Sequence, residues 1–355
     1  MLKLLRNNKE LITVVLAGSL VGIFGVYLSY MGNPRNSGIC ISCFMENLAG
    51  SLGLHGNTRM QYIRPEILGF VLGGFAAAYA AKEFRSEGGS SPIIRFIGGA
   101  LLIVGCSIFL GCPIKMSLRL SAGDLTALAG LVGLVFGVWA GYAFLRRGFN
   151  LGDATPLPAL NGLVTPLVMA GLFALLLIGP AFIYFSDKGP AAQKAPLMLS
   201  LGAGLVVGGL SQRSRFCVTG GIGNFIVSGD RSLLYGVVSM LAFGFLASLA
   251  FGQFTAGFEG QPGSHTAYLW SFLGMTLVGV TSILIGGCPF RQLILAGQGS
   301  ADAGAAVLGM VAGGALVQNW GISSTSMGPT VVGQAATLLG LAFVLILGVA
   351  MRVRD

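Results

Sequence analysis

"IGGCPFR" at residues 285–291 and "LGCPIK" at residues 110–115 each place a cysteine, a proline and a basic residue together at the end of an apolar run. Glycine lets a chain turn, and proline cannot continue a helix from the preceding residues but starts a new one well. Each stretch therefore predicts a helix that ends at the glycine before the cysteine and a second, short helix that begins after the cysteine.

The regions around these two motifs are strongly apolar. The chain of 355 residues is 54% hydrophobic and only 9% charged, whereas soluble domains carry about 25% charged residues. Runs of this length can cross a hydrocarbon core about 30 Å thick, so we expect an all-α polytopic membrane protein. Ten candidate spans lie near residues 11–30, 66–82, 93–110, 125–145, 161–185, 196–211, 232–251, 266–286, 302–318 and 331–350.

The net charge of +9 is assigned to loops at the membrane surface and not to nucleic-acid binding. With both termini in the cytoplasm of a bacterial inner membrane, the loops inside carry Lys3, Arg6, Lys9, Lys82, Arg85, Arg95, Arg146, Arg147, Arg213, Arg215, Arg231, Arg352 and Arg354. The loops outside carry only Arg35, Arg59, Arg64, Lys188 and Lys194. This asymmetry favours the stated orientation and leaves Lys115, Arg119 and Arg291 near the membrane interior.

The chain contains an internal repeat. An offset of 176 residues brings together Gly111 with Gly287, Cys112 with Cys288, Pro113 with Pro289 and Lys115 with Arg291. An offset of 177 residues brings Cys40 onto Cys217. We therefore predict two homologous halves, 1–185 and 196–355, joined by a linker at 186–195 within one membrane domain. Five spans in each half is an odd number, so the second half is expected to be inverted, an architecture typical of transporters with a binding site at the midplane.

The G-C-P segments are candidate anion-binding elements. Broken helices at membrane depth are tolerated only where they line a cavity or are buried in protein. The free amides and positive end of the second helix favour an anion, and intramembrane charges mark functional sites. The predicted substrate-binding residues at these two motifs are Gly111, Cys112, Lys115, Gly287, Cys288 and Arg291.

Two further segments, 31–53 and 211–229, mix short apolar stretches with polar residues and are predicted to be re-entrant helices that enter from opposite faces. They contain Cys40 and Cys217, which complete a set of four repeat-matched cysteines. Arg215 is expected to guide the anion at the exit, while Ser42 and Thr219 are weak candidates for polar contacts. Cys43 and Cys106 have no matched cysteine and are accessory candidates, with simple packing favoured for Cys106.

Cys40 and Cys43 form a C-x-x-C pair, which can bind metal, cycle between redox states or form a disulfide. No second C-x-x-C is present, and His55 and His265 fall in predicted loops, so a zinc or copper site is disfavoured. Soft thiols beside positive helix ends suit a soft anion of sulfur or selenium. We expect no cofactor and no metal. No carboxylate relay for proton coupling is apparent, although Glu46 merits a test.

The paired "GCP[I/F][K/R]" motifs and "QRSRFCVTGG" at residues 212–221 resemble the YeeE/YedE sulfur-transport family over nearly the whole chain. The N-terminal "NSGICISC" is similar to the selenium-associated YedE branch. The resemblance implies a pseudo-twofold, hourglass-like transporter that passes thiosulfate or a selenium oxyanion along a central path of cysteines. Carried over by motif, the path cysteines are Cys40, Cys112, Cys217 and Cys288. Membrane lipid and a cytoplasmic sulfur or selenium carrier protein are candidate partners.

In the expected mechanism, the anion enters a funnel that contains Arg35, Arg59 and Arg64 and leaves past Arg215. The chain is then not an enzyme. The competing interpretation is a membrane sulfurtransferase or thiol redox protein in which Cys112 or Cys288 carries a persulfide. A membrane subunit that anchors a soluble partner is the least favoured, because short cytoplasmic loops offer little docking surface.

Overall fold

The computed structural model describes residues 2–352, with side chains described from residue 9 onward. Arg354 and the side chains of Lys3 and Arg6, which entered the orientation argument, lie outside the described part. The helices are α1 (Leu2–Tyr30), α2 (Ile41–Ser51), α3 (Pro65–Ala80), α4 (Pro92–Phe109), α5 (Pro113–Ser121), α6 (Ala127–Arg146), α7 (Ala159–Ile178), α8 (Leu197–Ser214), α9 (Val218–Ser228), α10 (Ser232–Ala250), α11 (Tyr268–Leu284), α12 (Pro289–Gln298), α13 (Ala301–Asn319) and α14 (Val331–Ala350).

The architecture is all-α, as predicted, and each of the ten predicted spans coincides with a helix, but α3 and α8, at the predicted spans 66–82 and 196–211, are not among those long and apolar enough to cross a membrane. Within residues 2–352, eight segments are long and apolar enough to cross a membrane, and two of these contain the α4–α5 and α11–α12 breaks. The predicted span at 161–185 is too long, because α7 ends at Ile178. Gly179 takes a left-handed conformation (φ 59°) and Pro180 follows, so the helix cannot continue. The one small sheet pairs β1 (Glu87–Gly88) with β2 (Thr155–Pro156), antiparallel, in the described part of the chain.

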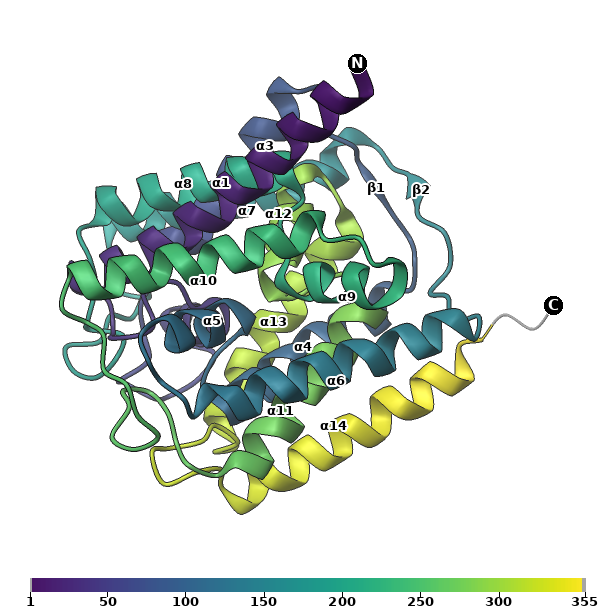
Figure 1. Cartoon of the computed structure of the whole chain (residues 1–355). Helices are drawn as coiled ribbons and strands as arrows, with labels where there is room; N and C mark the ends of the chain where they lie inside the picture. The colour runs from purple at the N-terminus through teal and green to yellow at the C-terminus, as the bar shows by residue number, and fades with distance from the viewer. Residues whose placement is uncertain (1, 353–355) are drawn as a thin grey trace.

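The long helices form two groups, with the short helices between them (Figure 1). One group contains α1, α3, α8 and α10, in which α1 packs on α10 and α3 packs on α8. The other contains α4, α6, α11, α13 and α14, in which α4 packs on α13 and α6 packs on α11. The short helices α5, α9 and α12 each contact both groups and so lie between them.

The helix bounds recur along the chain at the offset found in the sequence. Pro92 and Tyr268 begin α4 and α11, and Pro113 and Pro289 begin α5 and α12, both pairs 176 residues apart. The closest helix pairs each join a helix before residue 185 to one after residue 196. The two sequence halves are thus interlaced in space, while their inverted orientation stays a prediction.

Glycines allow the helices of the two halves to approach closely. A Cβ atom on Gly99 would overlap the carbonyl oxygen of Ala306, and a Cβ atom on Gly309 would overlap that of Phe96. The α4–α13 pair therefore depends on small residues on both helices, as is common where helices pack in lipid.

Replacing Gly309 with alanine is expected to lower the thermal stability of the detergent-solubilised protein, because the added methyl group meets backbone that cannot move away. We expect a loss of about 1–3 kcal/mol. The matched control is Gly202→Ala in α8, where nothing lies within 4 Å of the added methyl group. There alanine should stabilise the helix by about 0.5–1 kcal/mol. Equal melting temperatures for the two variants would contradict this packing.

Candidate functional site

The four repeat-matched cysteines occupy equivalent positions in the structure. Cys40, Cys112, Cys217 and Cys288 are the N-cap residues of α2, α5, α9 and α12, each with an extended backbone. All four are buried. An N-cap side chain faces the unpaired amides and the positive end of its helix. The Sγ of Cys217, for example, accepts a hydrogen bond from the amide of Gly220 at 3.4 Å. Four thiols are thus placed at four positive helix ends.

The four thiols form two pairs. In the first pair, the amide of Ile41, next to Cys40, donates to the Sγ of Cys112 at 3.3 Å. In the second pair, the Sγ atoms of Cys217 and Cys288 lie 3.6 Å apart. Helix α2 contacts α12 and α5 contacts α9, so short helices of the two pairs also touch each other.

A hydroxyl accompanies each pair at the same position in the repeat. The Oγ of Ser42 lies 3.5 Å from the Sγ of Cys40, and the Oγ1 of Thr219 lies 3.3 Å from the Sγ of Cys217. Both residues were only weak candidates in the sequence, and both contact the thiol two residues earlier. They add polar donors at the thiols in otherwise apolar surroundings.

Cys43 adds a third thiol to the first pair. Its Sγ lies 2.7 Å from that of Cys40, one helical turn away. All six cysteines are free thiols, including the C-x-x-C pair for which a disulfide was one alternative. No cluster of three or more His, Cys, Asp or Glu side chains placed to hold a metal ion occurs in the described part of the chain.

The glycines of the G-C-P motifs, Gly111 and Gly287, do not end the preceding helices as predicted, because α4 ends at Phe109 and α11 at Leu284. The left-handed residue at each break lies one position earlier, at Leu110 (φ 63°) and Gly286 (φ 89°), because that is where the preceding helix is capped. Gly111 and Gly287 instead make room for the basic side chains. A Cβ atom on Gly111 would lie 2.8 Å from Cδ of Lys115, and one on Gly287 would lie 2.7 Å from Cγ of Arg291.

Long-range side chains satisfy the carbonyl groups freed at the first break. The Nε2 of His265 and the Oγ of Ser324 donate to the carbonyl of Ile108, at 2.7 Å each. The amide of Ala267 donates to Nδ1 of His265, so the proton of the neutral ring is on Nε2. Both donors come from predicted loops far along the chain, and they stabilise a broken helix at membrane depth.

The second break is satisfied by one distant residue and one local residue. Arg95 donates through Nη1 to the carbonyl of Ile285 at 2.8 Å, and Gln292 donates to the same carbonyl at 3.0 Å. Asp302 binds the Ser90 hydroxyl and lies 3.6 Å from Nε of Arg95. These contacts fix the segment before Cys288.

Of the three basic residues predicted near the membrane interior, one has a carboxylate partner and two do not, among the described residues. Arg119 forms a buried ion pair with Asp124, with Nε 2.7 Å from Oδ2. Lys115 and Arg291 have no carboxylate within ion-pair distance among the described residues, and the buried Nη1 of Arg291 has no hydrogen-bond partner. Buried charge normally requires a partner, so these two side chains are available to an anion.

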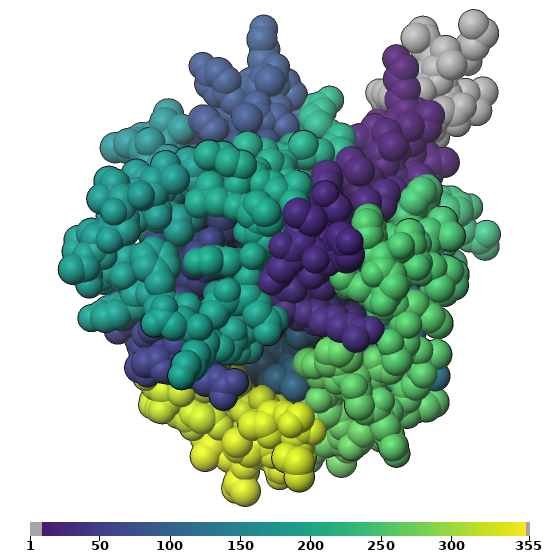
Figure 2. Space-filling view, turned by 90° about the vertical axis from the view of Figure 1, so that its left-hand side faces the viewer, coloured from purple at the N-terminus to yellow at the C-terminus, as the bar shows by residue number. Residues whose placement is uncertain are grey.

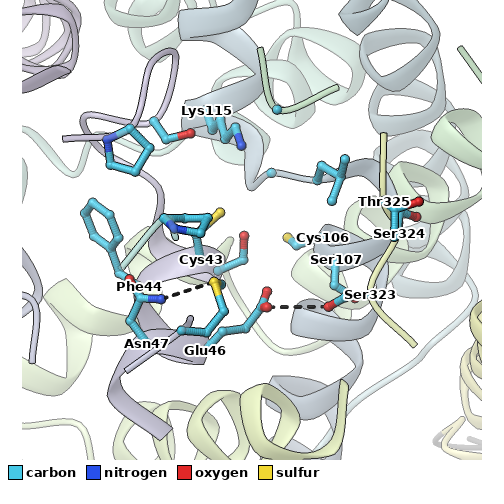
Figure 3. A pocket seen from close by; sticks show the side chains of 18 of the residues that line it. Cys43, Phe44, Glu46, Asn47, Cys106, Ser107, Lys115, Ser323, Ser324 and Thr325 are labelled. Carbon is cyan, nitrogen blue, oxygen red and sulfur yellow. Dashed lines mark hydrogen bonds between the residues drawn. The ribbon is translucent and has the colours of Figure 1, made fainter. Parts of the chain in front are cut away.

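A cavity of about 950 Å³ leads toward the first cysteine pair. The face shown in Figure 2 is hollowed where segments from early, middle and late parts of the sequence meet. The side chains of Cys43, Glu46, Cys106 and Lys115 point into the cavity from α2, α4 and α5 (Figure 3). Cys106, for which packing was favoured, therefore lies on the cavity wall, since the last turn of α4 faces this space.

The three arginines of the predicted funnel all line the cavity. Arg64 is fully buried and donates to Asn33, Asn47 and two backbone carbonyls, so it is a structural residue. Arg35 donates to the Gln253 carbonyl and the Thr255 hydroxyl. Arg59 is exposed and is the best placed of the three to meet a solute.

Arg215 is exposed, lies two residues before Cys217 and takes a left-handed conformation (φ 57°). In the sequence, Arg215 precedes Cys217 by two residues and Arg291 follows Cys288 by three, as Lys115 follows Cys112 by three.

Comparison with known proteins adds one finding. Residues 213–354 match a family model described as Sulphur transport. The match covers α9 to α14 and includes the motifs at Cys217 and Cys288. A search of curated proteins gave no match.

Proposed function

We propose that this protein is a membrane transporter that imports a small sulfur- or selenium-containing anion, such as thiosulfate or selenite, along a central path of cysteines. The observation that carries the proposal is the placement of four thiols at four helix N-termini, beside two basic side chains without carboxylate partners. The match of residues 213–354 to the sulphur-transport family supports a sulfur species as cargo.

The proposed path begins in the cavity of Figure 3 and passes Lys115 to reach Cys40 and Cys112. It continues to Cys217 and Cys288 and leaves past Arg215. At each pair the anion accepts hydrogen bonds from thiols and helix amides, which substitute for part of its water shell. The inverted repeat gives each half one such pair, facing opposite sides of a bacterial inner membrane. On the cytoplasmic side, a sulfur or selenium carrier protein would receive the cargo.

A second candidate function is a sulfurtransferase, favoured by the close approach of Cys217 and Cys288. In that reaction a thiolate attacks the outer sulfur of thiosulfate, a persulfide forms on Cys112 or Cys288, and sulfite leaves with the electron pair of the broken S–S bond. Mass spectrometry of the protein after incubation with thiosulfate distinguishes the two functions. A persulfide that a reductant removes favours transfer, and unmodified thiols favour transport.

Uptake of radiolabelled thiosulfate and selenite by cells tests the proposed path. We expect Cys112→Ala and Cys288→Ala each to lower uptake by at least about tenfold, because each removes one donor to a charged group. The matched control is Ser282→Ala, which removes a small buried side chain of α11 that has no hydrogen-bond partner. Unchanged uptake in both cysteine variants, at equal expression, would rule out the path.

A further inference from the structure

A buried carboxylate lies in the cavity that is proposed to admit an anion. Glu46, in α2, is only 5% exposed, and it lines the cavity together with Cys43, Cys106 and Lys115. Its side chain points into the same space as theirs (Figure 3). An ionised carboxylate at this place would repel the cargo, so its presence needs a physical explanation.

The hydrogen-bond partners of Glu46 are neutral. Its Oε2 accepts from the amide of Gln318 and from the hydroxyl of Ser323, the latter at 3.4 Å. No lysine or arginine lies within ion-pair distance of it in the described part of the chain. By contrast, the buried Asp124 and Asp302 each have an arginine partner.

The remaining buried carboxylate, Glu66, accepts from Asn33 and Ser200 and does not line the cavity. Glu46 is thus the one buried acid of the described residues that combines neutral partners with access to the cavity. A carboxyl group in such surroundings exchanges a proton with the cavity more readily than a carboxylate held by arginine.

Several other titratable groups lie near Glu46. From the elements around the cavity the titratable and charged groups are Arg35, Cys40, Cys43, His55, Arg59, Arg64, Cys106 and Lys115. The Nδ1 of His55 accepts from the amide of Asn57, and its Nε2 donates to the Glu46 carbonyl oxygen at 2.9 Å. Both ring nitrogens are occupied by backbone partners, so His55 is a structural residue. Lys115 is a buried cation that lines the same cavity as Glu46.

We propose that Glu46 binds a proton that enters with each anion, so that the protein is a proton–anion symporter; the inference rests on the proposed transport function. When the anion approaches Lys115, Glu46 takes up a proton from the same cavity, and the repulsion between the two negative charges disappears. Proton and anion then occupy the cavity together. Because α2 carries both Glu46 and Cys40, one helix links the proton site to the first thiol of the path.

The test uses purified full-length protein in liposomes that contain a pH-sensitive dye, with thiosulfate added outside. Wild-type protein should acidify the interior as thiosulfate enters. Since the protonated fraction of one carboxyl group falls by up to about tenfold per pH unit above its pKa, uptake should fall at least about fivefold between about pH 6 and about pH 8 outside. Glu46→Gln, which keeps a neutral polar side chain, should lose the acidification and vary less than about twofold over that range. The matched control Glu259→Gln, in an exposed loop, should behave as wild type.

A second variant keeps the proposal testable if Glu46→Gln does not fold. Gln318→Leu removes the amide that donates to the ionised carboxylate, so Glu46 should keep its proton at higher pH and the pH profile of uptake should move upward. Thiosulfate uptake without acidification by wild-type protein, or a wild-type pH profile in both variants, would overturn the symport proposal alone. Wild-type liposomes that take up neither thiosulfate nor selenite would instead overturn the proposed function.

Discussion

Replacing Arg291 with leucine is expected to lower anion uptake by about 10–150-fold without loss of stability, since a hydrogen bond to a charged group is worth about 1.5–3 kcal/mol. The buried Nη1 of Arg291 has no partner, and no carboxylate lies within ion-pair distance among the described residues. Removing a charge that nothing compensates takes away a cost to folding, so the variant should melt at the same temperature as wild type or above it.

Lower uptake without lower stability would show that Arg291 serves anion binding and not folding. Arg291→Lys serves as the conservative control, because lysine stands at the equivalent position 115 in the other half. That variant should keep uptake within about tenfold of wild type, with the loss due to fewer donors. Normal uptake in Arg291→Leu, or a clear loss of its stability, would assign Arg291 to structure.

Replacing Arg119 with leucine is expected to have the reverse effect, a loss of about 3–5 kcal/mol in stability, because it leaves Asp124 buried without its cation. The guanidinium also donates to the carbonyl of Phe109 at 3.0 Å and to the hydroxyl of Thr126 at 2.7 Å. It lies over the Phe109 ring, 4.4 Å from the ring centre. Arg119 therefore joins the end of α4 to the far end of α5 and fixes the break that carries Cys112.

Denaturant unfolding in detergent measures this loss, and a double variant provides its control. Arg119→Leu combined with Asp124→Leu removes both charges and should recover part of the stability lost in the single variant. If the single variant is as stable as wild type, the ion pair does not hold the break, and Arg119 would join Lys115 and Arg291 as a candidate for anion binding.

Much of the architecture was predictable from local sequence. Apolar runs located the long helices, because each must satisfy its backbone within itself in lipid. The G-C-P motifs located both breaks to within three residues, because Pro113 and Pro289 each begin a short helix. The end of α7 was missed, since the run up to residue 185 is apolar and only Gly179 and Pro180 stop the helix.

The cavity side of the site was less predictable. The hydrogen bond between Glu46 and Gln318 joins residues 272 positions apart, which no periodicity or motif reveals. Cys106 is in an apolar helix and resembles a core residue until the packing of α4 shows which side faces the cavity. The local repeat did predict which cysteines are equivalent, but their pairing depends on how four short helices meet.

Exchange of thiosulfate by the purified protein tests the central claim most directly. Liposomes that contain the protein and are loaded with unlabelled thiosulfate should accumulate radiolabelled thiosulfate from outside, whereas liposomes with Cys288→Ala or without protein should not. If the label enters protein-containing and protein-free liposomes at the same rate, the protein does not carry this anion, and the proposed cysteine path is wrong for thiosulfate.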